Sequence, residues 1–565
     1  MHSKKYLTLL LLLTFIVAQA QQENLPLNRN MILNYEKSLN QFDKAVFHSA
    51  VKPYNAAQVY EFVYPDTVQH YERVPHTNWF SKAVNVLGFE NFLEFDENGY
   101  VKHYGNVLAK DSVFYEDNIY DKGYKERKAY VAINPILNIG FGVDFASKKL
   151  ISYNLKGLEI RADIGKKFTI YTSFLNTVGK FPAYITLYSG ISGVVPGEGN
   201  IRNRGKGGLD FSSINAYLSY SPVKQFNIQV GNGKHFIGDG YRSLFLSDNA
   251  YTYPYVQLTT TIWRIKYMNI YAELIDNIRN FNDFGQGFPR KLANFNYFSI
   301  DAAKFLQLGI FEGITWRRTT AKGNTFFDYN FLNPLIGARA FQKKLDDNTT
   351  KIYGANIKIT CPKYVVIYGQ FMFNKYGKKN TVDRRMGWQA GVKYFDVAGV
   401  KNLNFQAEYN SVRPYSYQGQ DSAIGYYHYN QSLGHPMGAN FDEFLVMLNY
   451  QYKRFYASYK MSYIRAGTDS TLFKNFGNNV TDVIAKASTL TNVKMYNGIP
   501  YNTLDNEIKF GYILNPKINM VIEGKMQFRR YKANAISTDA LKTNSFMISF
   551  ATNIFNRYYD LPVLF

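Results

Sequence analysis

Residues 231–255 concentrate polar side chains that could bind a ligand or hold one another in place. Four glycines stand within positions 231–240, and glycine permits the tight, positive-φ backbone of a structured loop. A plain turn between strands needs fewer kinds of polar group. The pattern indicates either a loop folded into a lumen, where Arg and Asp bind a ligand or brace the pore, or a packed loop whose charges satisfy one another. Its candidate ligand-binding residues are His235, Asp239, Arg242, Asp248 and Asn249.

The same segment contains the residue types of a hydrolase without their arrangement. His235, Asp239 and Ser243 have the identities of a catalytic triad, but the strained turn that exposes a nucleophilic serine is missing. Residues 231–234 lack the spacing of a phosphate-binding loop and the Ser or Thr that follows its lysine. His428 stands apart from any Cys/His ligand spacing, as does His435. We therefore expect no catalytic residues, no cofactor and no metal, and the chain is not predicted to be an enzyme.

A second polar and aromatic run covers residues 408–417, 426–429 and 433–442. Tyrosine rings can stack on sugar faces while neighbouring polar groups bind hydroxyls, so this run favours carbohydrate. An aromatic belt at a membrane interface would give a similar composition, and both interpretations stay open. The candidate ligand-binding residues from this run are Arg413, Tyr415 and His435.

Along most of the chain the hydrophobicity of the side chains alternates with a period of two. This pattern predicts β-strands, which would hold these loops. From about residue 129 onward, apolar side chains alternate with polar or charged ones, so the two sets lie on opposite faces of a sheet. Charges on every second residue would cost several kcal/mol if they faced lipid, so they must face a lumen or a soluble protein's surface. One such strip comprises Leu403, Phe405, Ala407 and Tyr409 against Asn404, Gln406, Glu408 and Asn410.

The last such strip, residues 544–556, lies shortly before the C-terminal Phe565 and has the form of an outer-membrane barrel strand. Together the strips predict an all-β fold. Roughly sixteen to eighteen strand candidates follow residue 129, and since outer-membrane barrels prefer even numbers we expect a transmembrane antiparallel β-barrel of about 18 strands. A soluble periplasmic β-protein is the alternative. Short turns such as residues 515–516 and long polar loops such as 467–502 match the two ends of a barrel.

The N-terminus reads as an export signal. Lys4 and Lys5 precede an apolar run over residues 7–17, and the small residues Ala18 and Ala20 follow it. We expect a signal peptide over 1–20, a small helical or irregular periplasmic region over 21–128, and the barrel over 129–565. The spacing of apolar residues from Ile32 to Val46 predicts a helix in that region. The expected location is the outer membrane of the cell.

Composition fits an exported barrel. Aromatic residues make up 17% of the chain although its mean hydropathy is −0.29, a combination that inward polar and outward apolar residues produce. The formal net charge of +22 favours anionic partners such as lipopolysaccharide or acidic polysaccharide, although scattered lumen and loop lysines would give the same sum. Nucleic acid is not an expected partner, because no binding motif is present. The single cysteine, Cys361, excludes an internal disulfide.

Several motifs together resemble the Wzi-like capsule-assembly family of outer-membrane proteins. They are the Asp-Gly-Tyr-Arg-Ser-Leu and Ser-Asp-Asn-Ala elements of residues 231–255, with residues 194–197, 333–334 and 433–436. The abundance of Tyr, Asn and Lys is similar to the Bacteroidetes branch of that family, which includes a gliding-motility protein. The resemblance implies an eighteen-stranded barrel with a small helical periplasmic region that holds capsular or extracellular polysaccharide.

The expected partners are therefore outer-membrane lipid, surface polysaccharide, and gliding or secretion machinery. The function that the resemblance implies is polysaccharide binding or attachment in support of gliding or adhesion. The alternative is a transport pore for small or hydrophobic solutes.

Overall fold

The computed structural model describes a closed barrel together with a few short N-terminal pieces. The described residues are 33, 36–37, 47–54, 94–95, 101–102, 118–121 and 124–552, the last range with gaps at 165–166, 204, 206, 278–287, 319–328, 340–348, 362–363, 376–384, 422–423, 470–474, 484–492, 516–519 and 534–540.

Alternating side chains build the wall as the sequence predicts. In the strand Leu403–Val412 the polar row, including Glu408 and Asn410, is buried inside the barrel, whereas Leu403 and Phe405 of the other row are only partly buried. In the strand Leu541–Ala551 the apolar side chain of Ile548 is exposed on the outside, and Ser545 and Ser549 are buried. The period of two therefore separates lumen from lipid in both strands.

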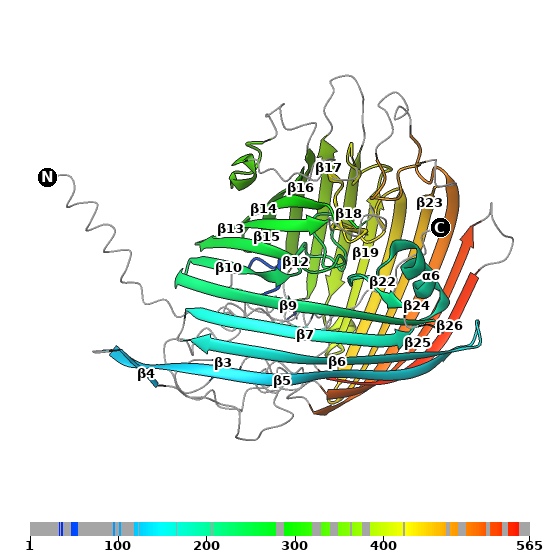
Figure 1. Cartoon of the computed structure of the whole chain (residues 1–565), viewed down its shortest axis with the longest axis horizontal. Coiled ribbons are helices and arrows are strands. Elements are labelled where there is room, and N and C mark those ends of the chain that lie inside the picture. Colours follow the sequence, from blue (N-terminus) through cyan, green and yellow to red (C-terminus); the bar gives the residue numbers. More distant parts are fainter. Residues whose placement is uncertain are drawn as a thin grey trace.

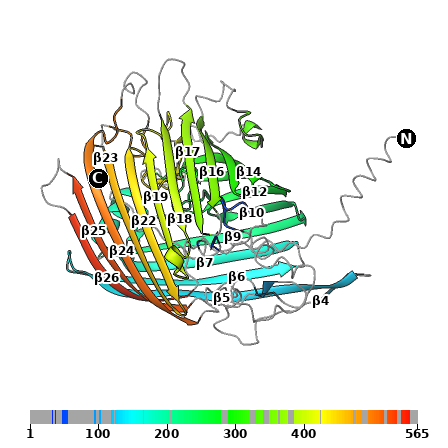
Figure 2. The same cartoon turned by 180° about the vertical axis from the view of Figure 1, so that it is seen from behind.

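Eighteen antiparallel strands form the wall, as predicted (Figures 1 and 2). The ring closes where β26 pairs with β5, with Ser545 opposite Asp144. In chain order the strands are β5 (Tyr124–Asp144), β6 (Lys149–Ile164), β7 (Phe168–Lys180), β9 (Gly208–Val223), β10 (Phe226–Gly233), β12 (Tyr253–Ile262), β13 (Ile265–Ile275), β14 (Arg290–Ala303), β15 (Leu306–Arg317), β16 (Thr349–Cys361), β17 (Val365–Lys375), β18 (Met386–Tyr394), β19 (Leu403–Val412), β22 (Phe441–Tyr452), β23 (Phe455–Thr468), β24 (Ile499–Asn515), β25 (Met520–Ala533) and β26 (Leu541–Ala551).

Short strands accompany this ring. β4 (Asn118–Asp121) pairs with the start of β5, and β8 (Arg202–Asn203) pairs with the start of β9. Elsewhere β2 (Glu94–Phe95) pairs with β3 (Val101–Lys102). A 3-10 turn, η3 (Val397–Gly399), joins β18 to β19.

The two ends of the barrel differ in the length of their connections. At one end, here the turn end, strands are joined by short connections such as 224–225, 263–264, 304–305 and 453–454. At the other, here the loop end, connections such as 181–207, 413–440 and 469–498 are long. β5 starts and β26 finishes at the turn end. Outer-membrane barrels have short periplasmic turns and long extracellular loops, so the loop end corresponds to the cell exterior.

Several described segments lie inside the lumen, and three of them bear on the candidate site. The inward loop (residues 234–252) leaves β10, and its strand β11 (Phe236–Ile237) pairs with β1 (Val51–Lys52) of the N-terminal segment (residues 47–54). The capping loop (residues 413–440) contains the hairpin of β20 (Tyr427–His428) and β21 (Gln431–Ser432). All three segments contribute to one buried core with the inner face of the wall, where Phe245 stacks on Phe311 of β15 at 4.9 Å.

One helix stands at the loop end, where the sequence predicted only barrel. The helix α6 (Ala183–Ser192) follows Pro182 and ends at Gly193, whose φ of 74° is the left-handed conformation that terminates helices (Figure 1). The described part of the predicted N-terminal helix is limited to Leu33, Glu36 and Lys37, which are helical and buried. Ile32 and Val46, which also carried that prediction, lie outside the described residues. No described helix has the length and apolar character to cross a bilayer.

The closed ring predicts heat-modifiable migration on a detergent gel. Unboiled protein should run differently from boiled protein, because a barrel without sheet edges keeps its ladder of hydrogen bonds in detergent until it is heated. The measurement is semi-native electrophoresis of purified protein with and without boiling. Equal mobility of the two samples would contradict the closed barrel.

Candidate functional site

The inward loop is fixed to the wall by buried charges. Arg242 forms an ion pair with Glu443 of β22 at 3.0 Å, and both side chains are at most 1% exposed. His435 of the capping loop contacts the same carboxylate at 2.9 Å. The backbone N–H groups of Tyr241 and Arg242 donate to Glu408 of β19 at 2.7 and 3.1 Å. The structure thus brings together Arg242 and His435, two of the predicted site residues, around Glu443.

Asp239 connects the inward loop to the N-terminal segment. Its carboxylate accepts hydrogen bonds from Ser49 at 2.5 Å and from Asn356 of β16 at 3.0 Å. Burial alone would raise the pKa of Asp239, but the charges of Lys358 and Lys52 and these hydrogen bonds outweigh burial and hold it below its usual value. Lys52 also donates to the carbonyl of Gly238 at 2.7 Å. The charge of Asp239 therefore holds two lumen segments together.

The remaining predicted residues of the inward loop are buried as well. His235 lies 3.1 Å from the hydroxyl of Tyr253 and packs edge-on against the ring of Tyr255 at 4.4 Å. Burial lowers the pKa of His235 to about 4, so the ring is neutral at pH 7. Ser243 donates to the carbonyl of Ile237, away from His235. Asp248 and Asn249 are at most 5% exposed.

Arg413 and Tyr415 lie apart from this network, in the capping loop. Arg413 donates to the carbonyl of Val493 at 3.0 Å, and the hydroxyl of Tyr415 donates to the carbonyl of Asn475 at 3.0 Å. Both contacts join the capping loop to the connection between β23 and β24. The eight predicted residues therefore make internal contacts in the described structure, and all of them except the half-buried Arg413 are buried.

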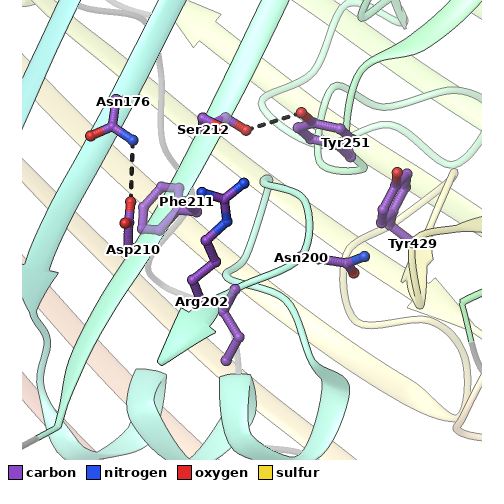
Figure 3. A pocket seen from close by; sticks show the side chains of 9 residues that line it. Asn176, Asn200, Arg202, Asp210, Phe211, Ser212, Tyr251 and Tyr429 are labelled. Atoms are coloured by element: carbon purple, nitrogen blue, oxygen red, sulfur yellow. Dashed lines mark hydrogen bonds between the residues drawn. The ribbon is translucent and has the colours of Figure 1, made fainter. Parts of the chain in front are cut away.

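A polar cavity of about 230 Å³ opens at the loop end of the barrel, between the ends of β7 and β9 and three long connections: residues 181–207, the inward loop and the capping loop (Figure 3). Figure 3 shows Asn176 and Asp210 on neighbouring strands on one side and the rings of Tyr251 and Tyr429 on the other. Its lining residues are Asn176, Asn200, Ile201, Arg202, Asp210, Phe211, Ser212, Tyr251 and Tyr429. We refer to it as the rim pocket.

Unusual backbone places one of the two tyrosines of the rim pocket, and close contacts place the other. Tyr429 and Asn430 form the turn of the β20–β21 hairpin with φ values of 49° and 57°, which few residues other than glycine adopt. The ring of Tyr429 meets that of Tyr251 edge-on at 4.9 Å. The hydroxyl of Tyr251 donates to the carbonyl of Ser212 at 3.0 Å. A Cβ atom at Gly199 would lie only 3.0 Å from the ring of Tyr251, so this position leaves no room for a side chain without movement.

Buried side chains join the loops around the rim pocket. Gln431 accepts from the N–H of Gly197 at 2.6 Å and donates to the carbonyl of Glu198 at 2.8 Å. His428 accepts from the N–H of Ile275 at 2.9 Å. Burial lowers the pKa of His428 to about 3, which keeps the accepting nitrogen unprotonated at pH 7. These contacts fix the pocket walls before any ligand arrives.

The chemistry of the rim pocket combines two aromatic rings, amides, a carboxylate and a guanidinium. Asn176 donates to Asp210 at 3.1 Å, and the side chain of Arg202 is exposed beside them. Rings with hydrogen-bonding groups around them suit a ligand with both apolar faces and hydroxyls. In the described part of the chain, no three His, Cys, Asp or Glu side chains lie close enough to hold a metal ion.

Sequence reasoning found parts of the rim pocket but not the pocket itself. Tyr429 belongs to the aromatic run of the capping loop, and Arg202 is followed in the sequence by two further basic residues, Arg204 and Lys206. Asn176, Asp210 and Ser212 look like ordinary polar positions of alternating strands, so no local signal distinguishes them. Tyr251 directly follows the Ser-Asp-Asn-Ala element, and this adjacency was the one available clue.

Among the comparisons with known proteins, only that with solved structures finds a similar fold. No family model and no curated protein matches the chain. Among solved structures, Wzi of Escherichia coli, described as a carbohydrate-binding β-barrel involved in group 1 capsule assembly, matches with a TM-score of 0.55 and 11% identity over 94% of this chain and 100% of that one.

Two Pseudomonas aeruginosa proteins match less closely. OprD matches with a TM-score of 0.40 and 10% identity, over 75% of this chain and 96% of that one. OccK9 matches with a TM-score of 0.42 and 9% identity, over 75% and 98%. At these scores they carry no argument about this chain. The chain is thus a closed eighteen-strand barrel of the bacterial outer-membrane type, and over nearly all of its length its fold is similar to that of Wzi.

Proposed function

We propose that this outer-membrane barrel binds surface polysaccharide and holds it at the cell exterior through the rim pocket. The observation that carries the proposal is the pairing of Tyr251 with Tyr429 above the polar side chains of β7 to β9. Both rings come from loops at the end that corresponds to the exterior. The carbohydrate binding of Wzi, whose fold is similar, supports the same ligand class.

Charge favours an acidic glycan. Arg202 stands exposed at the rim pocket, and the chain carries a formal net charge of +22. A positive surface raises the local concentration of anionic ligands, and a guanidinium binds carboxylate or phosphate groups through two parallel hydrogen bonds. We propose that Arg202 contacts the acidic group of the glycan while the tyrosines contact its ring faces.

The inward loop has a supporting role in this proposal. Thr252, next to Tyr251, accepts at its carbonyl a contact of 3.2 Å from His428, which immediately precedes Tyr429. The residues Arg242, Asp239 and His435 hold the loops that meet at this point. Their direct contact with ligand, which the sequence predicts, remains a prediction, as it does for Arg413 and Tyr415.

The finer physiological role is also part of the proposal. The resemblance to the Bacteroidetes branch supports polysaccharide attachment in gliding or adhesion, together with gliding or secretion machinery as a partner. A strain that lacks the gene should release polysaccharide into the medium or spread less on agar. Full retention of polysaccharide and normal spreading in that strain would argue against this role.

Glycan binding by rim-pocket variants tests the proposal directly. Tyr251→Ala and Tyr429→Ala should each weaken binding of polysaccharide purified from the producing bacterium by about tenfold, the equivalent of 1.4 kcal/mol. Each variant loses one ring face and leaves the wall unchanged. Calorimetric titration of detergent-solubilised protein provides the measurement.

The matched control is Tyr364→Ala. Tyr364 is an exposed tyrosine in the connection between β16 and β17 at the turn end, far from the rim pocket. Its removal should leave affinity unchanged. Equal affinity of all four proteins for the polysaccharide would exclude the rim pocket as the binding site.

A further inference from the structure

The outer face of β15 changes character half-way along the strand. Phe311 stacks on Phe245 of the inward loop, so odd-numbered residues of β15 face the lumen and even-numbered ones face outward. Near the turn end the outward residue Ile310 is 50% exposed, as a lipid-facing side chain should be. The next outward residues toward the loop end, Glu312, Ile314 and Trp316, are at most 1% exposed although they stand on the outside of the barrel.

Polar groups of the neighbouring strands share this outward position. Glu312 lies opposite Asn296 of β14 on one side and Tyr353 of β16 on the other, and Asn296 lies opposite Asn269 of β13. Amides and a carboxylate therefore form a polar patch on the outer wall. The neighbouring side chain of Asn294 is also fully buried. A bare ionised group at this depth of a bilayer would be costly.

The polar patch is covered by a segment that folds back over the outside of the barrel. This external strap, residues 329–339, includes the short helix η1 (Tyr329–Leu332), which lies outside the ring of strands beside β14 and β16 in both views (Figures 1 and 2). Arg339 pairs with Glu312 at 2.7 Å, and both side chains are fully buried. The same guanidinium donates to Asn294 at 2.9 Å. The strap thus neutralises the charge that the wall presents.

Backbone groups of the strap bind the rest of the polar patch. The carbonyl of Pro334 accepts from Asn269 at 3.1 Å, and the carbonyl of Arg339 accepts from Lys351 of β16 at 3.2 Å. Below the strap Phe331 packs edge-on against Trp316 at 5.6 Å. The strap is therefore docked by an ion pair, by backbone hydrogen bonds and by an apolar contact.

The outer surface of the strap is apolar. Tyr329 is 83% exposed and Leu335 is 62% exposed, with Leu332 and Pro334 also exposed between them. We propose that the strap is a membrane-embedded segment whose outer surface contacts the acyl chains of outer-leaflet lipid. The strap covers the polar patch, so that this half of the outer wall presents an apolar surface to lipid as Ile310 does nearer the turn end. Lipid is the partner because the strap covers the loop-end half of a wall whose turn-end half faces lipid.

Spin-label accessibility tests the proposal independently of glycan binding. In a Cys361→Ser background, Leu335→Cys carries a nitroxide label, and the protein is reconstituted into phospholipid vesicles. Collision with lipid-soluble oxygen should exceed collision with a water-soluble nickel chelate, as it should for the lipid-facing control Ile310→Cys. Ala146→Cys, exposed in the loop-end connection between β5 and β6, should show the reverse order.

Two results would overturn the proposal. A Leu335 label that collides with the nickel chelate as often as the Ala146 label would place the strap in water. A label shielded from both reagents, with dipolar broadening, would place a second copy of the chain against the strap in place of lipid. Since each measurement uses an otherwise native chain, a failure of ion-pair variants to assemble does not affect the outcome.

The ion pair provides a second measurement. Arg339→Gln in the Leu335→Cys protein should release the strap and raise collision with the nickel chelate at least several-fold, while the Ile310 label keeps its oxygen preference. A Leu335 label whose two collision rates are unchanged by Arg339→Gln would show that the Arg339–Glu312 pair does not hold the strap.

Discussion

Replacing Arg242 by alanine should lower the free energy of unfolding by about 3–5 kcal/mol, because it leaves the buried carboxylate of Glu443 without its cation. The pair spans 3.0 Å and both side chains are at most 1% exposed, so the carboxylate left behind lies away from bulk water. His435 contacts the same carboxylate and offers only partial compensation. Urea unfolding in detergent, followed by tryptophan fluorescence and by heat-modifiable migration, measures the loss.

The matched control is an arginine in a solvent-exposed pair. Arg290 pairs with Glu273 at 2.6 Å, but its side chain is 57% exposed. Arg290→Ala should therefore change the free energy of unfolding by about 0–1 kcal/mol. If the two variants lost equal stability, the buried network around Glu443 would not be what fixes the inward loop.

Deleting residues 238–246 of the inward loop, with a short Gly-Ser linker in their place, should convert a closed barrel into a conducting one. An eighteen-stranded wall is wide enough for an aqueous channel when nothing fills it. In the intact protein the inward loop, the N-terminal segment and the capping loop share one buried core across the lumen. Planar-bilayer recordings should show negligible current for the intact chain and large stepwise openings for the deletion.

This experiment also separates the two functions considered for the chain. A transport pore would conduct in its intact form, whereas a polysaccharide-binding scaffold has no need of an open lumen. The control is the double variant Tyr251→Ala, Tyr429→Ala, which alters the rim pocket and leaves the lumen filled. Stepwise conductance of the intact protein comparable to that of the deletion would favour transport.

The strands of the wall could be predicted from sequence because the pattern that marks them lies within each strand. In β19 the polarity of each side chain indicates the face of the wall on which it lies, since Glu408 and Asn410 point inward and their neighbours point outward. Hydrophobic alternation of this kind requires no knowledge of distant partners. The strand number and the two kinds of connection followed from the same pattern.

The candidate site could not be predicted in this way because it is assembled from distant loops. Tyr251 lies near the end of the inward loop, Tyr429 lies in a hairpin of the capping loop, and Asp210 lies near the start of β9 in the wall. Nothing in the neighbourhood of any one of them indicates the other two. The polar residues around Gly238 are the opposite case. The sequence places many functional groups close together there, but in the structure these groups contact the wall and the N-terminal segment.

The pairing of β1 with β11 constrains the order in which this protein can assemble. The N-terminal segment precedes all eighteen strands of the wall in the sequence, yet the partners of Ser49 and Lys52 are residues 238–239 and Lys358 of the inner wall, far downstream. Bringing such distant residues together costs chain entropy that a closed wall reduces, because the wall already confines the loop. We therefore expect the N-terminal segment to dock only after the wall has closed, because its partners belong to the wall and to the inward loop.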